Sequence, residues 1–330
     1  MIYLGIDVSK KKLDAKLLLD PTQVKFKSKS VTNTAQGVAE LLAWTLRHSG
    51  CAVAEVHAVM EATGVYHELA ATVLFDAGVR VSVVNPAQLK EFARGLAVKS
   101  KNDGIDTAVL ARYGALLNPA PWQPEPRKVR ELKALLARLD AIEADLRREL
   151  NRQEKTEHAT VPAEVLESLA KSVAFLREEQ ARLQQRIKDH IDGHPTLRQD
   201  RALLQTIPAI GDKTAFRMLA LLRSRAFASA SQAAAYVGLV PVEHQSGSSV
   251  CKRPRLSKAG NARFRAALYM AAVVATRYNP DIRAQYQRLL AAGKSKMSAL
   301  GAAMRKLVHI CFGVLKHQTP YVAQCGQKYP

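Results

Sequence analysis

A proline-rich stretch at residues 118–127 limits the folds open to this chain more than any other feature. Its sequence, NPAPWQPEPR, holds four prolines in ten residues. Proline lacks a backbone N–H and its ring clashes with the preceding helical turn, so no helix continues through the stretch. A chain of 330 residues can form two or three separately packed domains. We therefore place a linker at residues 118–128.

The segment before the linker, residues 1–117, is predicted to be an α/β domain. Apolar or alternating runs at 3–7, 13–19 and 24–31 predict three successive strands, and a helix capped by Thr34 follows to Ser49. Further strands are expected at 52–60 and 79–84, each followed by a helix, the first ending at Ala77 and the second starting near Pro86. The order βββαβαβα indicates a mixed sheet covered by helices, which matches the ribonuclease H plan shared by RuvC-like nucleases.

Four carboxylates occupy positions that this plan would bring together. Asp7 ends the first predicted strand and Glu61 the fourth, and those strands are neighbours in the plan. Asp103 and Asp106 are three residues apart on a predicted helix, so both face one side. Converging carboxylates repel one another unless cations neutralise them, so we expect two Mg²⁺ ions ~4 Å apart that clamp a phosphate. The alternative is that each acid only caps a turn or a helix.

Two long helices are expected over residues 129–195. From Val129 to about Glu157 leucines recur on one stripe, and from Leu166 to His190 apolar positions alternate in threes and fours. That spacing is a heptad seam, and such a seam needs a partner helix. The two helices could fold back on each other as a hairpin, or pair between protomers as a dimerisation arm, and the spacing fits both.

The chain is strongly basic, and the excess is concentrated near its C-terminal end. Lys and Arg number 49 against 29 Asp and Glu, and residues 241–330 alone hold 15 basic and 2 acidic residues. This excess favours a polyanionic partner. No apolar run approaches the ~20 residues of a membrane helix and no signal peptide is evident, so we expect a cytoplasmic, nucleoid-associated protein that binds nucleic acid and no membrane. The four scattered cysteines argue against a zinc ribbon or a disulfide framework.

A run of hydroxyls precedes a dense set of cations in the last predicted domain, residues 196–330. The run is SGSS at 246–249, and three basic helices are expected at 256–277, 280–292 and 295–316. A hydroxyl beside many cations suits attack on a phosphodiester, whereas the bland alternative is an ordinary turn next to a solvated basic face. The candidate nucleic-acid-binding cations are Lys252, Arg253, Arg255, Lys258, Arg263 and Arg265.

A second candidate DNA contact lies at residues 207–214, IPAIGDKT. The sequence predicts a helix end, a tight glycine turn and a new helix capped by Asp212 or Thr214. It resembles a helix-hairpin-helix, whose turn amides and following helix N-terminus bind a DNA phosphate, with Lys213 as a further candidate ligand. A purely structural hairpin is the alternative.

Eight short motifs follow one another along nearly the whole chain, and together they resemble the transposases of the insertion sequence 110 family, related to the Piv invertases. They are GIDVSK at 5–10, EATG at 61–64, NP at 85–86, DxxD at 103–106, IPxIG at 207–211, AxxGLxP at 235–241, SGSS at 246–249 and SKAG at 257–260. Asn102 and Thr107 depart from the family's usual Lys-Thr-Asp and Asp-Ala around the paired aspartates, but both carboxylates are present.

The resemblance implies a RuvC-like domain whose four acids, Asp7, Glu61, Asp103 and Asp106, bind Mg²⁺, and a transposase domain whose nucleophile is Ser246. It implies a DNA transposase that joins this serine to a 5′ phosphate and exchanges strands between donor and target DNA, in several members guided by a structured bridge RNA. His244 could act as the base for Ser246 if the strand between them is regular. Because several strands must be cut, we expect a homo-oligomer, either a dimer or a tetramer.

Two other interpretations stay open. In the first, the protein is a metal-dependent Holliday-junction resolvase in which water attacks the phosphate and Ser246 only packs a turn. In the second, it is a non-catalytic DNA- or RNA-binding protein on a degenerate nuclease fold.

Overall fold

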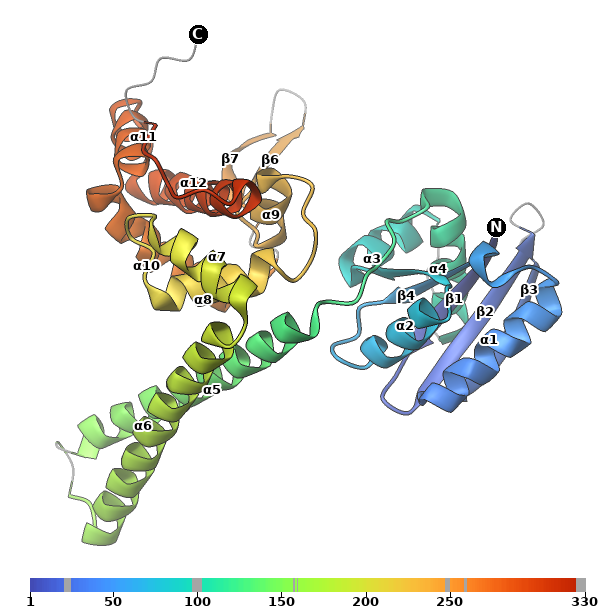
Figure 1. Ribbon diagram of the computed structural model, residues 1–330, viewed down its shortest axis with the longest axis horizontal. Coiled ribbons are helices and arrows are strands. Elements are labelled where there is room, and N and C mark those ends of the chain that lie inside the picture. The colour runs from blue at the N-terminus through green and yellow to red at the C-terminus, as the bar shows by residue number, and fades with distance from the viewer. Residues whose placement is uncertain are drawn as a thin grey trace. The chain divides into compact units, whose positions relative to one another are not determined.

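The computed structural model describes residues 1–20, 25–96, 103–156, 158, 160–246, 250–257 and 260–324, and within these it describes the backbone alone for 103–105, 243–246 and 250–254. The chain divides into two compact units, residues 1–124 and 125–330, and the boundary falls within the proline-rich stretch (Figure 1). Each unit is built around its own buried apolar residues.

The first unit contains a five-stranded mixed sheet in the order β3-β2-β1-β4-β5. Its strands are β1 (Ile2–Val8), β2 (Lys12–Asp20), β3 (Lys25–Thr32), β4 (Val56–Glu61) and β5 (Arg80–Val84). β1, β4 and β5 are parallel, whereas β2 is antiparallel to both β1 and β3. The predicted meander and the predicted pairing of the first and fourth strands are confirmed. The fourth strand starts later than predicted, because residues 53–55 form a 3₁₀ turn that the Ala52 N–H closes by donating to Glu55 Oε2 at 2.8 Å.

Helices cover both faces of this sheet. They are α1 (Ala35–Ser49), α2 (His67–Asp76), α3 (Pro86–Gly95) and α4 (Asp103–Leu117). The predicted cap of α1 is confirmed, since Thr34 Oγ1 accepts from the Gly37 N–H at 3.1 Å. On β4, Ala58 and Met60 pack with α1 and α2 on one face, whereas Val59 packs with α3 and α4 on the other. Alternate residues of one strand therefore serve two cores.

The second unit begins with a helical hairpin. α5 (Arg127–Thr156) and α6 (Ala163–Asp192) pack along each other, and Leu139 and Ile142 share one core with Leu183 and Ile187 (Figure 1). Full burial of each such side chain contributes about 1.5–3 kcal/mol. The two helices thus form a hairpin within one chain, the first of the two alternatives, and the seam is buried at Val173, Leu183 and Ile187 but not at the exposed Leu166. Pairing between protomers stays a prediction.

The rest of the second unit, as far as its residues are described, is helical apart from one β-hairpin. Its elements are α7 (Pro195–Gln205), α8 (Asp212–Leu222), α9 (Ala230–Tyr236), β6 (Pro241–Ser246), β7 (Val250–Leu256), α10 (Ala262–Tyr278), α11 (Pro280–Ala291) and α12 (Lys296–His317). The prediction of a helix from Leu256 was wrong, because Leu256 pairs with Pro241 in the hairpin. α10 starts only after Gly260, whose φ of +95° and close approach to the Tyr236 carbonyl oxygen require glycine.

α12 is long and apolar enough to cross a membrane by length and composition, with a mean hydropathy of 1.3. The expectation that no apolar run reaches such a length was therefore wrong. Half of this stretch is buried within the second unit, where Leu307, Val308 and Cys311 are inaccessible to solvent. The core helix of a helical domain has the same composition, and nothing else among the described residues points to a membrane.

Candidate functional site

Two of the predicted acids lie side by side at one edge of the sheet. β1 and β4 run parallel with Ile6 paired to Met60, and Asp7 and Glu61 are the next residues on each strand. Residues that pair across neighbouring strands belong to the same face. Asp7 and Glu61 therefore share one face at the carboxyl ends of adjacent strands, and both side chains are half-buried.

α4 packs on that face and brings a third acid towards the same edge. A Cβ on Gly5, two residues before Asp7, would lie only 2.1 Å from the Thr107 carbonyl oxygen. A Cβ on Gly114 would lie 2.8 Å from Cγ2 of Val59. Because α4 runs from the carboxyl ends of the strands back along them, its first turn, with Asp106 next to Thr107, lies at the edge that carries Asp7.

The donor chemistry of this edge suits a hard divalent cation, because carboxylate oxygens are the ligands that Mg²⁺ prefers. Among the described side chains, however, no group of three or more His, Cys, Asp or Glu is close enough to hold a metal ion. The side chain of Asp103, the fourth predicted ligand, lies outside that description. The fold thus gathers Asp7, Glu61 and Asp106 at one edge without closing them into a coordination shell.

One amide joins the loops that follow the two strand-end acids. Asn33 Nδ2 donates to the carbonyl oxygen of Ser9 at 2.9 Å and to that of Tyr66 at 3.0 Å. Ser9 lies two residues after Asp7, and Tyr66 follows Glu61 in the connection to α2. Asn33 is not part of any sequence motif, so its role in joining the two loops could not be predicted from the sequence.

The structure also places a fifth carboxylate beside Asp7. Asp14 on β2 is the register partner of Asp7, and its carboxylate is 2.8 Å from Lys12 Nζ. The sequence alone gave no reason to separate Asp14 from other polar positions of a half-exposed strand. Only the register between β1 and β2 reveals that it neighbours the predicted metal ligands.

The candidate nucleophile is the last residue of a strand. Ser246 pairs with Val250 across the β6–β7 hairpin, and His244 pairs with Lys252. The irregularity in pairing lies earlier, between Val242 and His244. His244 and Ser246 are thus two residues apart on a regular strand and belong to the same face of the hairpin. Residues 247–249 lie outside the described residues.

The predicted nucleic-acid-binding cations differ in how they are engaged. Lys252 and Arg253 are residues of β7, and Lys258 lies outside the described residues. Arg255 and Arg263 are exposed, whereas Arg265 is half-buried and donates from Nη1 to the carbonyl oxygens of Val237 and Gly260 at 3.2 and 3.0 Å. Arg265 therefore holds the turn before α10, whatever else it binds.

The predicted phosphate-binding turn before α8 is capped differently from the expectation. Gly211 is the N-cap and no side chain caps the helix, so the assignment to Asp212 or Thr214 was wrong. Asp212 Oδ1 instead accepts from Arg201 Nε at 3.0 Å and Gln205 Nε2 at 2.8 Å.

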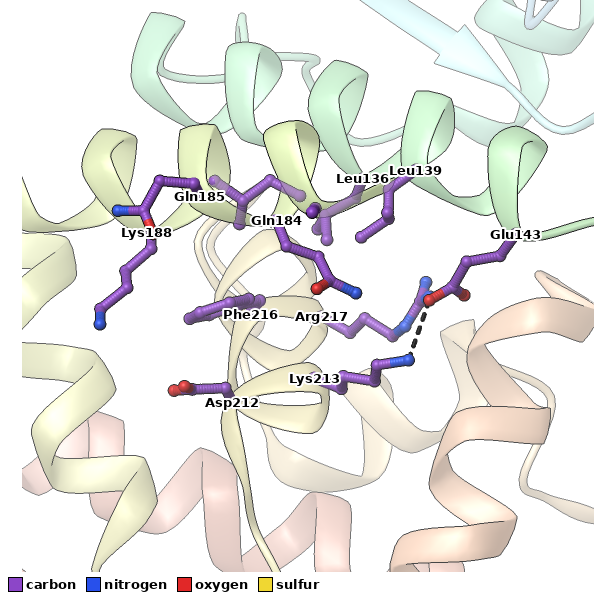
Figure 2. Close-up of a pocket in the computed structure, with 12 residues that line it drawn as sticks. Leu136, Leu139, Glu143, Gln184, Gln185, Lys188, Asp212, Lys213, Phe216 and Arg217 are labelled. Carbon is purple, nitrogen blue, oxygen red and sulfur yellow. Dashed lines mark hydrogen bonds and ion pairs between the residues drawn. The ribbon is translucent and has the colours of Figure 1, made fainter. Parts of the chain in front are cut away.

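Lys213 is already paired with a carboxylate. Its Nζ lies 2.9 Å from Glu143 Oε1, beside a groove of about 310 Å³ between α8 and the α5–α6 hairpin (Figure 2). A phosphate at the N-terminus of α8 would thus have to compete with Glu143 and Asp212.

Comparison with known proteins gives matches along most of the chain. A family model described as a transposase, of the IS110 type with a DEDD acid set, matches residues 4–162, and the model of the IS116/IS110/IS902 transposase family matches residues 201–287. The chain is 33% identical over 322 residues to the pilin gene-inverting proteins of Moraxella lacunata and Moraxella bovis, covering 97% of this chain and of each relative. It is 28% identical over 158 residues to an uncharacterised insertion element IS110 protein of Streptomyces coelicolor, covering 48% of this chain and 38% of the relative.

Proposed function

The chain belongs to the IS110 family of transposases and is a DNA recombinase, and from this premise we propose that it cuts and rejoins DNA through a covalent bond between Ser246 and a 5′ phosphate. The observation that supports this most is the placement of Ser246 at the end of β6, in the regularly paired part of the hairpin, with His244 on the same face and basic residues on the paired strand. Relatives named for inverting a gene must rejoin the strands that they cut. A covalent intermediate provides for rejoining, because the phosphodiester bond is exchanged and not hydrolysed.

In the proposed step, the Ser246 hydroxyl transfers its proton to a base and its oxygen bonds to phosphorus. The bond from phosphorus to the 3′ oxygen breaks, and that oxygen takes up a proton. His244 is the nearest candidate for the base. Rejoining reverses the step, with a 3′ hydroxyl of another strand as the attacking group. Lys252, Arg253, Arg255, Lys258 and Arg263 hold the strand and offset the charge that develops on the phosphorus oxygens.

The RuvC-like domain is proposed to span residues 1–117, and Asp7, Glu61, Asp103 and Asp106 are the proposed Mg²⁺ ligands of its site. A bound divalent cation would supply charge neutralisation at a phosphoryl oxygen and a lower pKa for a bound hydroxyl. Asp7 and Glu61 present their carboxylates from the rigid ends of two paired strands. Asn33 holds the two loops that follow them.

We further propose that residues 129–195 and 196–330 form the paired-helix and transposase domains of a homo-oligomer that binds donor DNA, target DNA and a structured bridge RNA. Phosphate contacts carry affinity without sequence information. A chain with a net charge of +20 and only 6% aromatic residues suits a protein that leaves sequence choice to base pairing.

The test is incubation of the purified protein with Mg²⁺, RNA from the flank of its element and end-labelled donor and target DNA, resolved on a denaturing protein gel. We expect label at the mass of the protein in wild type and none with Ser246→Ala. The matched control, Ser248→Ala, removes a hydroxyl from the same run and should retain the adduct. Adducts that persist in Ser246→Ala would remove this serine from the role of nucleophile.

The second candidate is a metal-dependent resolvase in which water attacks the phosphate. The observation that favours it is the pair of acids, Asp7 and Glu61, at the ends of adjacent strands, because such a site needs no serine. It predicts cleaved DNA without label on the protein, and equal activity of wild type and Ser246→Ala. A non-catalytic binding protein predicts no cleavage at all and no effect of Asp7→Asn or Glu61→Gln.

A further inference from the structure

The helices on one face of the sheet leave part of that face open next to the acids. On this side α4 packs against β1, β4 and part of β2, where Leu18 is buried, and six residues of β2 and β3 remain accessible beside the helix. We call them the open face; they are Lys12, Asp14, Lys16, Phe26, Ser28 and Ser30. A groove of about 230 Å³ runs over five of them, all except Phe26, and reaches Thr107 of α4. The other side of β2 is closed, because Leu13, Ala15 and Leu17 are buried under α1.

We propose that the open face binds the sugar-phosphate backbone of the DNA strand that enters the acid site. This inference rests on the proposed function in one respect, namely that the strand-end acids act on DNA. It goes beyond that function because none of these six residues belongs to the predicted metal or nucleophile sites.

The open face is continuous with the acids. Asp7 pairs with Asp14, and Asp14 pairs in turn with Ser30, so the three residues form one row across three strands. The next row runs from Gly5 through Lys16 to Ser28. Neighbouring strands are about 4.8 Å apart, so a row extends roughly 10 Å from β1. That distance corresponds to roughly three nucleotides at the ~3.4 Å rise of one duplex strand.

The chemistry of the open face suits a phosphate backbone. Ser28 and Ser30 are exposed hydroxyls, which donate to phosphate oxygens. Lys16 Nζ lies 5.6 Å from the centre of the Phe26 ring and has no carboxylate partner among the described side chains. The one acid of the open face, Asp14, is paired with Lys12 at 2.8 Å. A half-buried aromatic ring beside a lysine can also stack on a base.

Lysines often protect the edge strand of a sheet, and this role accounts for the lysines of β3 but not for Lys12 and Lys16 of β2. β3 is an edge strand, and lysines on an edge prevent pairing with another chain. Lys25, Lys27 and Lys29 have that position, and they stand on the opposite side of β3 from Ser28. Lys12 and Lys16 belong to β2, which is paired on both sides and has no edge to protect.

The turn before β2 adds charge at the end nearest to Asp7. Lys10 and Lys11 are exposed, and Ser9 Oγ fixes the turn by donating to the Lys12 carbonyl oxygen at 2.9 Å. The lysines of the turn and of β2 thus line the path by which a DNA strand reaches the acids. The carboxylates at that edge repel phosphate groups unless cations surround them, so these lysines would favour the approach of the strand.

Photocrosslinking tests this site in the full-length protein. The probe is a short single-stranded DNA that carries 5-iododeoxyuridine, irradiated with the protein and mapped by mass spectrometry of peptides. We expect a cross-link at Phe26. Lys16→Glu should lower its yield about fivefold or more, as loss of one charge contact of ~1 kcal/mol would. The matched control, Lys27→Glu, makes the same change of charge one residue along the neighbouring strand but on its other face, and should leave the yield within about twofold.

Three outcomes would overturn the proposal. Equal losses in Lys16→Glu and Lys27→Glu would show general electrostatics in place of a site. A cross-link formed by an iodouridine RNA but not by the DNA would assign the open face to the guide. A changed oligomeric state of Lys16→Glu, with no change in cross-linking, would make a second copy of the chain the occupant. Ser246→Ala protein should cross-link as wild type does, so failure of the serine mechanism would leave this result untouched.

Discussion

At the scale of single residues, the backbone at Ala209 is the feature that departs most from what its side chain favours. Its φ is +81°, in the left-handed region that glycine occupies without steric cost. The position lies in the turn between α7 and α8, which resembles a helix-hairpin-helix in sequence. An L-residue in this region loses roughly 1–2 kcal/mol.

We therefore expect Ala209→Gly to increase the free energy of unfolding. The gain should be about 0.5–1 kcal/mol, because relief of strain exceeds the extra entropy that glycine gives to the unfolded chain. Chemical denaturation followed by circular dichroism measures it. Ala181→Gly, at an exposed position inside α6, makes the same substitution and should lower stability by about 1 kcal/mol. A loss of stability in both variants would show that the turn does not require left-handed backbone at Ala209.

At the scale of elements, the approach of α4 to β1 determines where the acids meet. No side chain separates them at Gly5, and a Cβ there would fall 2.1 Å from the Thr107 carbonyl oxygen and 2.5 Å from the Ala111 nitrogen. Both contacts are to backbone, so a methyl group cannot be accommodated by a rotamer change. The helix would have to move, and Asp106 would move with it.

Gly5→Ala should accordingly destabilise the first unit by about 1–3 kcal/mol and abolish any divalent-metal binding that depends on α4. Thermal unfolding and calorimetric titration with Mn²⁺ measure the two effects separately. Gly95→Ala is the matched control, since a Cβ at this position in α3 meets nothing within 4 Å. It should leave metal binding unchanged and should not lower stability, because alanine favours the helix by up to about 1 kcal/mol. Unchanged metal binding in Gly5→Ala would mean that the acids do not depend on this approach.

The elements also show how far sequence patterns reach. The strands β1, β4 and β5 were predictable because burial on both faces leaves short continuous apolar runs. β2 and β3 were predictable because their burial largely alternates, and the caps Thr34 and Asn85 lie at ordinary helix starts. The β6–β7 hairpin was missed because residues 243–249 are polar throughout and carry no such alternation. Asp14 and Asn33 were missed because their relation to the acids exists only in the register of β1 with β2 and in a contact between distant loops.

At the scale of the whole molecule, a buried histidine links the sheet of the first unit to the segment that leaves it. His57 Nε2 lies 2.9 Å from Ser82 Oγ, which donates to the carbonyl oxygen of Ala120 at 2.9 Å. When the serine donates to that carbonyl, the histidine donates from Nε2, and the unprotonated nitrogen is then Nδ1, for which no hydrogen-bond partner is found among the described residues. Burial in the first place, and the nearby Arg80 in the second, lower the pKa of His57 to about 4.

The first unit should therefore lose stability on mild acidification. Between an unfolded pKa near 6.5 and the folded value of about 4, the unfolded chain takes up a proton that native His57 refuses, so stability falls as the pH falls through this window. We expect a loss of about 2 kcal/mol from pH 7 to about pH 5. Both tryptophans, Trp44 and Trp122, belong to the first unit, so fluorescence follows its unfolding apart from that of the second unit. In His57→Gln the side chain still offers a hydrogen-bond donor but does not titrate. The loss of stability from pH 7 to about pH 5 should therefore be smaller in this variant than in wild type, by most of the whole effect of about 2 kcal/mol. The loss of stability that remains in His57→Gln is assigned to His67, because burial also lowers the pKa of that histidine. Equal losses in wild type and His57→Gln would exclude His57 as the source.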